Sequence, residues 1–398
     1  MGCAEPVQRI QRIFEPVPMG GNVVSRPRAK AQKSKPRARG PPPLTYAQAG
    51  VDVAREEKGI KSLIAALGFE RTGSGKPIPM PGGYAGLVEF GDWALVLCTD
   101  GVGSKVEIAQ AVKKFDTVGI DCIAMNVNDC ICVGGEPLAF VDYLAMEKTD
   151  KDMMHEIGKG LGAGARESNV SIIGGETASL PDLVNGFDLA GTCMGVVKRD
   201  KVLDGRRVEA GDVIIGVPSH GVHSNGFTLI RKLVAKHKLS WNAKAPFAKG
   251  SSLGLALLEP TKIYVKPALA LLRSGLDVKA FAHITGGGLQ NLPRMNRGFR
   301  YVVDEPLDPQ PVFAWLRKLG GLDPVEMYKT FNMGMGFAVV TSETDADAAI
   351  ELLTRELDAG LQPLVKENAG EAPRVVGRVE RGYGCTLAPL EATYESKT

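Results

Sequence analysis

The sequence predicts a mixed α/β protein of two domains, and three observations support this class. The chain has 398 residues, which exceeds the size that a single hydrophobic core normally reaches. Short runs of branched apolar residues alternate with segments of helical period. Hydrophobic residues make up 44% and charged residues 23% of the chain, which is ordinary for a globular protein. We therefore expect an α/β or α+β protein with two folded units.

Residues 44–200 are expected to form the first domain. Branched or alternating apolar residues predict strands at 93–98, 140–144, 170–173 and 189–197. A helix is expected over 151–167, with Asp150 as its N-cap. Its apolar face consists of Met154, Ile157, Leu161 and Ala165. Turn-forming residues between 204 and 212 place the domain boundary near residue 200.

Residues 201–390 repeat the mixed pattern and are expected to form a second α/β domain. Strands are expected at 213–217, 281–284 and 336–340, and helices at 225–237, 267–273 and 289–297. An apolar stripe between 346 and 357, ended by Gly360, predicts a further helix. Residues 391–398 are expected to be a tail. Neither half has a G-x-G-x-x-G sequence opening a helix after a strand, which argues against a dinucleotide-binding domain.

Residues 1–43 differ in composition from the rest of the chain. They are rich in Arg, Lys and Pro and show neither helical nor strand period. Seven basic side chains and no acidic one lie between Arg26 and Arg39, so the net charge of +3 comes from this segment. We expect a disordered basic arm, with an organelle transit peptide as the alternative. The remaining body is slightly acidic and gives no electrostatic case for nucleic-acid binding.

Apolar runs and cysteines indicate the compartment. The chain has no run of eighteen or more apolar residues, so no transmembrane span is expected. Seven cysteines form no C-x-x-C pair, and five lie in or beside apolar stretches. Reduced, buried thiols fit this pattern better than disulfides or zinc ligands. We therefore expect a soluble, cytoplasmic protein.

The segment Thr99–Lys105, Thr-Asp-Gly-Val-Gly-Ser-Lys, follows the first expected strand and combines groups that suit a polyphosphate. Glycines let backbone N–H groups approach phosphate, and Lys105 can neutralise its charge. Asp100 can face phosphate only with a divalent cation between them. The spacing is not that of a Walker A loop. A glycine turn with a solvated lysine is the alternative.

Two further acidic residues follow apolar runs. Asp129 comes after 119–125, and Glu176 directly follows the strand expected at 170–173. Acidic residues at comparable strand ends suggest a shared cation, and oxygen ligands without histidine suit Mg²⁺. As alternatives, Asp129 is a helix cap or a surface carboxylate, and Glu176 is an ordinary loop residue.

Two loops of the second half can receive an anion. His223-Ser224-Asn225-Gly226 leads into an expected helix, for which Ser224 and Asn225 are good N-caps. His223 is a candidate acid or base, with a structural or solvent-facing histidine as the alternative. Thr285-Gly286-Gly287-Gly288 follows a strand in the same way, although glycine triplets are often only turns.

Taken in order, these motifs resemble the phosphoribosylformylglycinamidine cyclo-ligase family (aminoimidazole ribonucleotide synthetases) of purine biosynthesis, from Tyr46 to about Arg381. The resemblance is carried by segments 49–52, 99–105, 117–121, 126–129, 135–137, 174–177, 223–226, 259–266, 283–288, 326–328 and 330–332. It implies ATP and Mg²⁺ as cofactors and a ribonucleotide as substrate. ATP would phosphorylate a formyl amide oxygen before an amidine nitrogen closes the imidazole ring.

The resemblance also implies roles for individual residues. Asp100, Asp129 and Glu176 would hold Mg²⁺, and Lys105 and Asp100 would take part in catalysis through the phosphates. His223 is our own candidate for the third catalytic residue, as the proton carrier. The residues implied in binding ATP or substrate are Gly101, Gly103, Ser104, Asp121, Asn126, Asn128, Thr177, Ser224, Asn225, Gly226, Thr285, Gly286 and Gly287. The implied fold has two α/β domains, the first of which forms a β-barrel across a homodimer. Neither nucleic acid nor membrane is expected as a partner.

Three departures from the family pattern stand out. Only 81–86 remains of a longer glycine-rich segment near the ATP site of bacterial members, His220 replaces the usual second serine of Ser-Ser-Gly, and the basic arm has no counterpart. Thiamine-monophosphate kinase, selenophosphate synthetase and the hydrogenase-maturation carbamoyl dehydratase share the carboxylate plan and are the alternative enzymes. The last two would need reactive cysteines that the chain lacks at the required places. A nucleotide-sensing or nucleic-acid-binding protein is the alternative outside catalysis.

Overall fold

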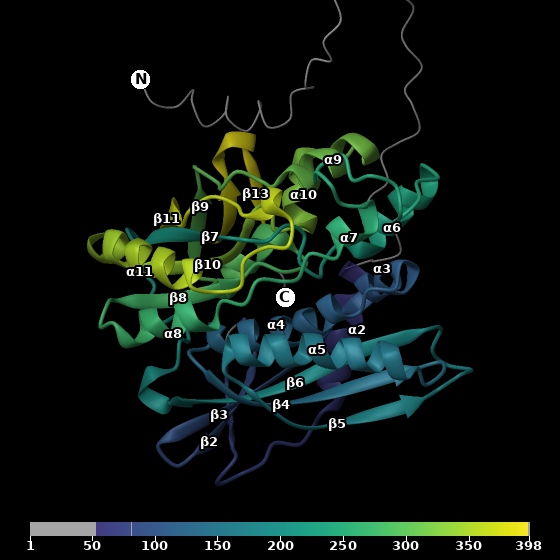
Figure 1. Cartoon of the computed structure of the whole chain (residues 1–398). Helices are drawn as coiled ribbons and strands as arrows, with labels where there is room; N and C mark the ends of the chain where they lie inside the picture. The colour runs from purple at the N-terminus through teal and green to yellow at the C-terminus, as the bar shows by residue number, and fades with distance from the viewer. Residues whose placement is uncertain (1–52, 81, 397–398) are drawn as a thin grey trace, which may run out of the picture.

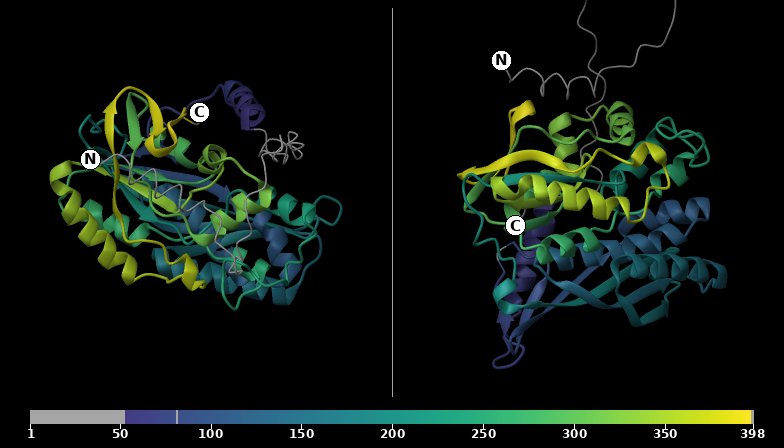
Figure 2. Two further views of the ribbon diagram at one scale, coloured as in Figure 1. Left: turned by 90° about the horizontal axis from the view of Figure 1, so that it is seen from above. Right: turned by 60° about the vertical axis from the view of Figure 1, so that its left-hand side comes forward.

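The computed structural model describes residues 53–80 and 82–396 and shows two layers, each built on one sheet. Figure 1 shows the first domain below and the second above, and the right-hand view of Figure 2 shows the same two layers. The mixed α/β class is confirmed. The expected arm at 1–43 lies outside the described residues. Helix α2 (Val53–Ala66) begins the described chain, and Leu63 and Ile64 on it are exposed.

The first sheet has six strands in the order β1-β2-β3-β6-β4-β5. They are β1 (Pro77–Ile78), β2 (Gly86–Phe90), β3 (Trp93–Gly101), β4 (Glu136–Met146), β5 (Ser171–Ser179) and β6 (Phe187–Lys198). Neighbours are antiparallel except β4 and β5, which are joined by helix α5 (Lys151–Ser168). Asp150 caps α5 as predicted, because its carboxylate accepts from the backbone N–H groups of Asp152 and Met153.

Helix α4 (Asp116–Cys132) is the longest of the helices that the sequence did not predict. It packs on α5 and on β3, β4 and β6, and it also contacts the second domain. Since nearly every residue of α4 is buried, its apolar residues show no helical period, and a helix of this kind cannot be recognised by amphipathicity. Helices α4 and α5 approach closely at Gly160, where a Cβ would lie 1.8 Å from the backbone O of Asp116.

The opposite face of the first sheet is apolar and exposed. Both α4 and α5 lie on the side of the sheet that faces the second domain (Figure 1). On the other side Leu97, Tyr143 and Met194 are 44%, 43% and 36% exposed. The sheet is open within one chain, since β1 and β5 are its two edges. The expected barrel is therefore not formed by a single chain.

The second sheet has seven strands in the order β13-β12-β9-β11-β7-β10-β8. They are β7 (Val213–Pro218), β8 (Val278–His283), β9 (Phe299–Val303), β10 (Met335–Thr341), β11 (Arg374–Arg381), β12 (Gly384–Leu387) and β13 (Ala392–Tyr394). The α-helices of this half are α6 (Phe227–Lys236), α7 (Leu253–Leu257), α8 (Val265–Arg273), α9 (Pro311–Gly320), α10 (Pro324–Thr330) and α11 (Ala346–Asp358). The short α3 (Val106–Val112) belongs to the first domain.

Several local expectations for the second half were wrong. The expected tail at 391–398 contributes β13, which pairs with β12. The helix expected at 289–297 is the 3-10 helix η3 (Gly288–Arg294). Helix α6 begins after Gly226, whose left-handed backbone serves as the N-cap position, so neither Ser224 nor Asn225 caps it. The positive φ of 79° at Gly226 is one that only glycine adopts readily, which explains the difference.

The buried-thiol expectation is confirmed for the six cysteines that the structure describes, which are all free and buried. Between residues 53 and 396, position 81 excepted, no helix is both long enough and apolar enough to cross a membrane.

Candidate active site

Lys105 ends the short 3-10 helix η1 (Gly103–Lys105), and its side chain is fully buried. Its Nζ lies 2.7 Å from Asp121 Oδ2 and donates to the backbone O of Glu259 at 2.7 Å. Asp121 Oδ1 accepts from the backbone N–H and the hydroxyl of Thr261, at 2.7 and 2.6 Å. Both charges are thus neutralised inside the protein. Lys105 and Asp121 thereby hold the first domain to the segment 259–261. The expected roles of Lys105 toward phosphate and of Asp121 toward ATP or substrate stay predictions.

Other expected site residues surround this buried pair. Ser104 lies 3.0 Å, hydroxyl to hydroxyl, from Thr228 in the first turn of α6. Ser224 lies 3.4 Å from Thr261 in the same manner. The structure therefore brings the loop 99–105 and the loop 223–226 together, although they are more than a hundred residues apart.

Asp129 and His283 form a second pair, at the boundary between α4 and β8. Asp129 Oδ1 lies 2.9 Å from His283 Nδ1, which fixes Nδ1 as the protonated nitrogen when the carboxylate is ionised. His283 is fully buried, and its Nε2 has no hydrogen-bond partner among the described residues. The Asp129 side chain is 19% exposed. The pair is thus an oriented imidazole with one nitrogen available.

Asn128 and His223 lie beside this pair. Asn128 bridges the domains, because its Nδ2 donates to the backbone O of Lys262 and its Oδ1 accepts from the backbone N–H of Tyr264. His223 Nε2 accepts from the backbone N–H of His220 at 3.1 Å. Burial, followed by the nearby cations, lowers the pKa of His223 well below its ordinary value, so the ring is neutral. Its φ of 63° is unusual for a residue with a side chain.

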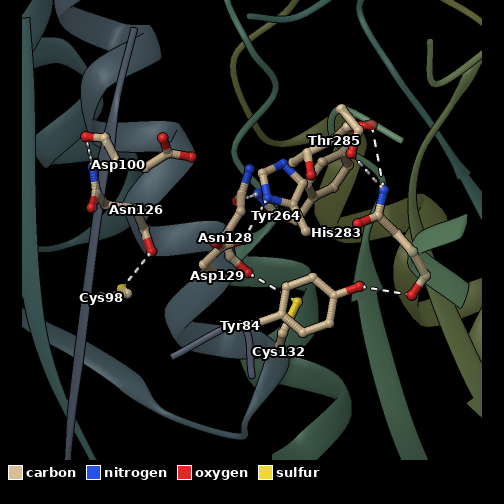
Figure 3. Close-up of polar contacts among 12 residues, drawn as sticks. Tyr84, Cys98, Asp100, Asn126, Asn128, Asp129, Cys132, Tyr264, His283 and Thr285 are labelled. Carbon is tan, nitrogen blue, oxygen red and sulfur yellow. Dashed lines mark hydrogen bonds and ion pairs between the residues drawn. The ribbon is translucent and has the colours of Figure 1, made fainter. Parts of the chain in front are cut away.

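Asp100 and Asn126 stand on the first-domain side of the same region (Figure 3). Asn126 Nδ2 donates to the backbone O of Asp100 at 3.1 Å, and its Oδ1 is buried without a partner among the described residues. Asp100 Oδ1 accepts from the backbone N–H of Gly101 at 2.7 Å. Figure 3 also shows His283 and Thr285 on the second-domain side, with Asn128 and Asp129 of α4 between the two groups.

The register of the first sheet separates Glu176 from Asp100. Asp100 and Asp142 both pair with Gly191, so their side chains share one face. Glu176 pairs with Tyr143, the residue after Asp142, and therefore lies on the opposite face. Glu176 also stands inside β5 rather than at a strand end, which corrects the strand-end expectation. In residues 53–80 and 82–396 no three His, Cys, Asp or Glu side chains are gathered as a metal would require.

Asp142 is a further candidate carboxylate of the site that sequence reasoning missed. Burial raises the pKa of its carboxyl. Asp142 on β4 and Asp100 on β3 lie on either side of Gly191, which is on the strand β6 between them. A Cβ at Gly175 would lie 2.5 Å from Asp142 Oδ1, so the glycine leaves room for the carboxylate. No motif pointed to Asp142, because it stands inside a long strand.

The loops 223–226 and 285–288 lie against each other. A Cβ at Gly286 would lie 3.0 Å from Asn225 Oδ1. Gly287 and Gly288 have positive φ angles, and a Cβ at Gly288 would lie 2.0 Å from the backbone O of Tyr328. Glycine is therefore required at Gly288 by both conformation and space.

Known proteins resemble this chain in both domains. Family models described as the N-terminal and C-terminal domains of AIR synthase related proteins match residues 82–197 and 209–360. A phosphoribosylformylglycinamidine cyclo-ligase of Methanosarcina mazei is 52% identical over 310 residues, which are 78% of this chain and 92% of that protein. The chain belongs to the phosphoribosylformylglycinamidine cyclo-ligase family. The resemblance expected from the motifs is confirmed, and the chain is an enzyme.

A second member supports the same assignment. The cyclo-ligase of Methanococcus maripaludis is 50% identical over 310 residues, 78% of this chain and 88% of that protein. Solved structures share the fold at lower identity. Thiamine-monophosphate kinase from Stenotrophomonas maltophilia has a TM-score of 0.55 at 21% identity and covers 86% of this chain and 97% of that one. Hydrogenase maturation protein HypE in complex with ATP has a TM-score of 0.55 at 19% identity, with coverages of 75% and 83%.

Proposed function

We propose that the enzyme closes formylglycinamidine ribonucleotide to aminoimidazole ribonucleotide, using ATP and releasing ADP and phosphate. The 52% identity across both domains with a curated cyclo-ligase carries this proposal. An amide oxygen is a poor leaving group until it is phosphorylated. Transfer of the γ-phosphoryl group to the formyl oxygen therefore comes first, and attack of an amidine nitrogen on the formyl carbon then expels phosphate.

The two adjacent loops, 223–226 and 285–288, are the proposed anion-binding wall. Glycine-rich loops present backbone N–H groups to phosphate oxygens at close range. The proximity of Asn225 to Gly286 supports their acting as one surface. The other residues of the expected site that stay predictions are Gly101, Gly103, Ser104, Lys105, Asp121, Asn126, Asn128, Thr177, Ser224, Gly226, Thr285 and Gly287.

Mg²⁺ would enter with ATP on the Asp100 side. Mg²⁺ prefers oxygen ligands, and the buried Asn126 Oδ1, which has no partner among the described residues, is an oxygen of this kind. Asp100 and Asp129 are the carboxylates proposed to hold the ion, which when bound would neutralise charge on the phosphates. Glu176 stays a prediction, because it shares neither face nor strand end with Asp100.

His283 is the proposed proton acceptor during ring closure, in preference to His223. The amidine nitrogen must lose a proton as it attacks the formyl carbon. His283 Nε2 is free among the described residues and its ring is oriented by Asp129, whereas His223 Nε2 already accepts from His220.

The exposed sheet face supports a homodimer, in which two first sheets meet as a barrel. Leu97 and Met194, which pair across β3 and β6, would be covered there, since adjacent exposed apolar side chains on a sheet face favour association. Met194→Glu is expected to yield monomers in sedimentation equilibrium, because a carboxylate would be buried without a partner. Leu183→Glu, at an exposed turn, is the matched control and should leave the mass unchanged. A monomeric unsubstituted protein would contradict the dimer.

The division near residue 200 and the cytoplasmic location stay predictions.

An assay of the two products tests the function. The protein is incubated with ATP, Mg²⁺ and formylglycinamidine ribonucleotide, and ADP and aminoimidazole ribonucleotide are measured. Equal amounts of both products, dependent on substrate, are expected. ADP formation that does not depend on the ribonucleotide would overturn the proposal.

A further inference from the structure

Arg294, the last residue of η3, reaches across to the glycine-rich segment 82–86 of the first domain. Its Nε donates to the backbone O of Gly82 at 2.9 Å, and one terminal nitrogen donates to the backbone O of Gly83 at 2.7 Å. Its guanidinium plane lies 3.8 Å from the centre of the Tyr84 ring. The guanidinium therefore fixes three consecutive residues of the first domain.

The segment 82–86 and the helix η3 approach each other closely at this point. A Cβ at Gly82 would lie 2.0 Å from the backbone O of Arg294, and Gly82 has a φ of 87°. Only glycine fits there without moving η3. The segment is thus shaped to receive η3.

The same residues hold the triple-glycine loop. The other terminal nitrogen of Arg294 donates to Asn291 Oδ1 at 3.1 Å, and Asn291 Nδ2 donates to the backbone O of Gly288 at 2.9 Å. The hydroxyl of Tyr84 donates to the backbone O of Asn291 at 3.0 Å. Figure 3 shows this hydroxyl directed toward the segment that carries Thr285. Burial raises the pKa of Tyr84, so the hydroxyl remains a donor.

We infer that Arg294 is a positioning residue that locks the segment 82–86 of the first domain to the anion-binding loop 285–288 of the second. Arg294 acts through Asn291 and Tyr84 and does not itself reach the reacting atoms. The lock sets the position of the backbone N–H groups of 285–288 before ligand arrives, which lowers the ordering cost of binding. The part of the inference that concerns binding rests on the proposed function.

Two substitutions separate the guanidinium geometry from its charge. Arg294→Gln removes both. Arg294→Lys keeps the charge but cannot donate to Gly82 and Gly83 in a fork. Arg355→Gln is the matched control, because Arg355 is exposed on α11 and, within the part of the chain that the structure describes, pairs with its neighbour Glu356 alone. All are compared as full-length protein.

The first readout is amide hydrogen exchange, which needs no activity. Exchange at 83–86 and at 286–288 is expected to rise about tenfold or more in Arg294→Gln and Arg294→Lys, with strands β7 and β10 unchanged. Wild-type exchange at 286–288 in Arg294→Gln would overturn the lock. Wild-type exchange in Arg294→Lys would overturn the fork geometry. Arg355→Gln should match the wild type.

The second readout is the split between KM and kcat. The KM for ATP or for the ribonucleotide should rise about tenfold in Arg294→Gln while kcat stays within about threefold, since the loop binds and does not react. A purely structural residue would lower the active fraction, and hence kcat, at constant KM, and that result would overturn the inference. An inactive wild type with the expected exchange pattern would count against the proposed function alone.

Discussion

Two pairs of ionisable side chains each include an aspartate of α4, and they differ in burial and in the partners that surround them. The Lys105–Asp121 pair is fully buried, and its atoms are engaged by Glu259 and Thr261. The Asp129–His283 pair has one partly exposed carboxylate and one imidazole nitrogen without a partner among the described residues. The first pair joins the two domains inside the protein, whereas the imidazole of the second keeps a nitrogen that could accept a proton or a ligand. We therefore expect the first pair to contribute mainly to stability and the second mainly to the catalytic rate.

Removing Lys105 should produce the largest effect on stability. Lys105→Met leaves the buried Asp121 carboxylate without its cation and is expected to lower the unfolding free energy by about 3–5 kcal/mol, measured by urea denaturation. Asp121→Asn in the same chain should recover part of this loss. Lys114→Met, which breaks the exposed pair with Asp116, should cost less than about 1 kcal/mol. Equal losses for Lys105→Met and Lys114→Met would break the comparison.

Changing the Asp129–His283 pair should affect the catalytic rate more than the stability. Asp129→Asn removes the group that orients His283 and is expected to lower kcat about 100-fold, while the unfolding free energy changes by less than about 1 kcal/mol. Steady-state kinetics with saturating ATP and ribonucleotide provide the measurement. Asp182→Asn, on an exposed turn, is the control and should keep the wild-type rate. A normal kcat with a large loss of stability would mean that the second pair is structural like the first.

Stability should also depend on pH through the histidines beside these pairs. Burial lowers the pKa values of His220 and His223 well below the ordinary one. The unfolded chain binds these protons below about pH 6.5 and the folded chain does not, so stability is lost as pH falls below that value. Each histidine contributes a slope of about 1.4 kcal/mol per pH unit there. His220→Asn should reduce the slope of the unfolding free energy against pH by this amount. Urea denaturation at several pH values between about 5 and 6.5 measures that slope. An unchanged slope would contradict the neutral burial of His220.

How far the sequence predicts this molecule depends on whether a residue's environment has a local signature. The amphipathic helix α5 and its Asp150 cap were predicted, because buried residues recur along it with the helical period and the other face is exposed to solvent. Helix α4 was not predicted, since it is buried on all sides. The strand expected to end at Ile173 continues to Ser179, because β5 pairs with β4 across the two glycines that suggested a loop.

The site shows the same limit. The glycine loops and the ligand-type residues were named from the sequence, but their partners come from tertiary contacts. Nothing local indicated that the Lys105 ammonium would pair with Asp121 and donate to Glu259, which lie 16 and 154 residues away along the chain. His283 stood beside the triple-glycine loop in the sequence, yet only its contact with Asp129 gives it a role.

The fate of one oxygen atom tests the central claim most directly. Formylglycinamidine ribonucleotide labelled with ¹⁸O in the formyl group is converted with unlabelled ATP, and the released phosphate is examined by mass spectrometry. If the formyl oxygen is phosphorylated and then expelled, each phosphate carries one ¹⁸O. Unlabelled phosphate accompanying aminoimidazole ribonucleotide would contradict the account.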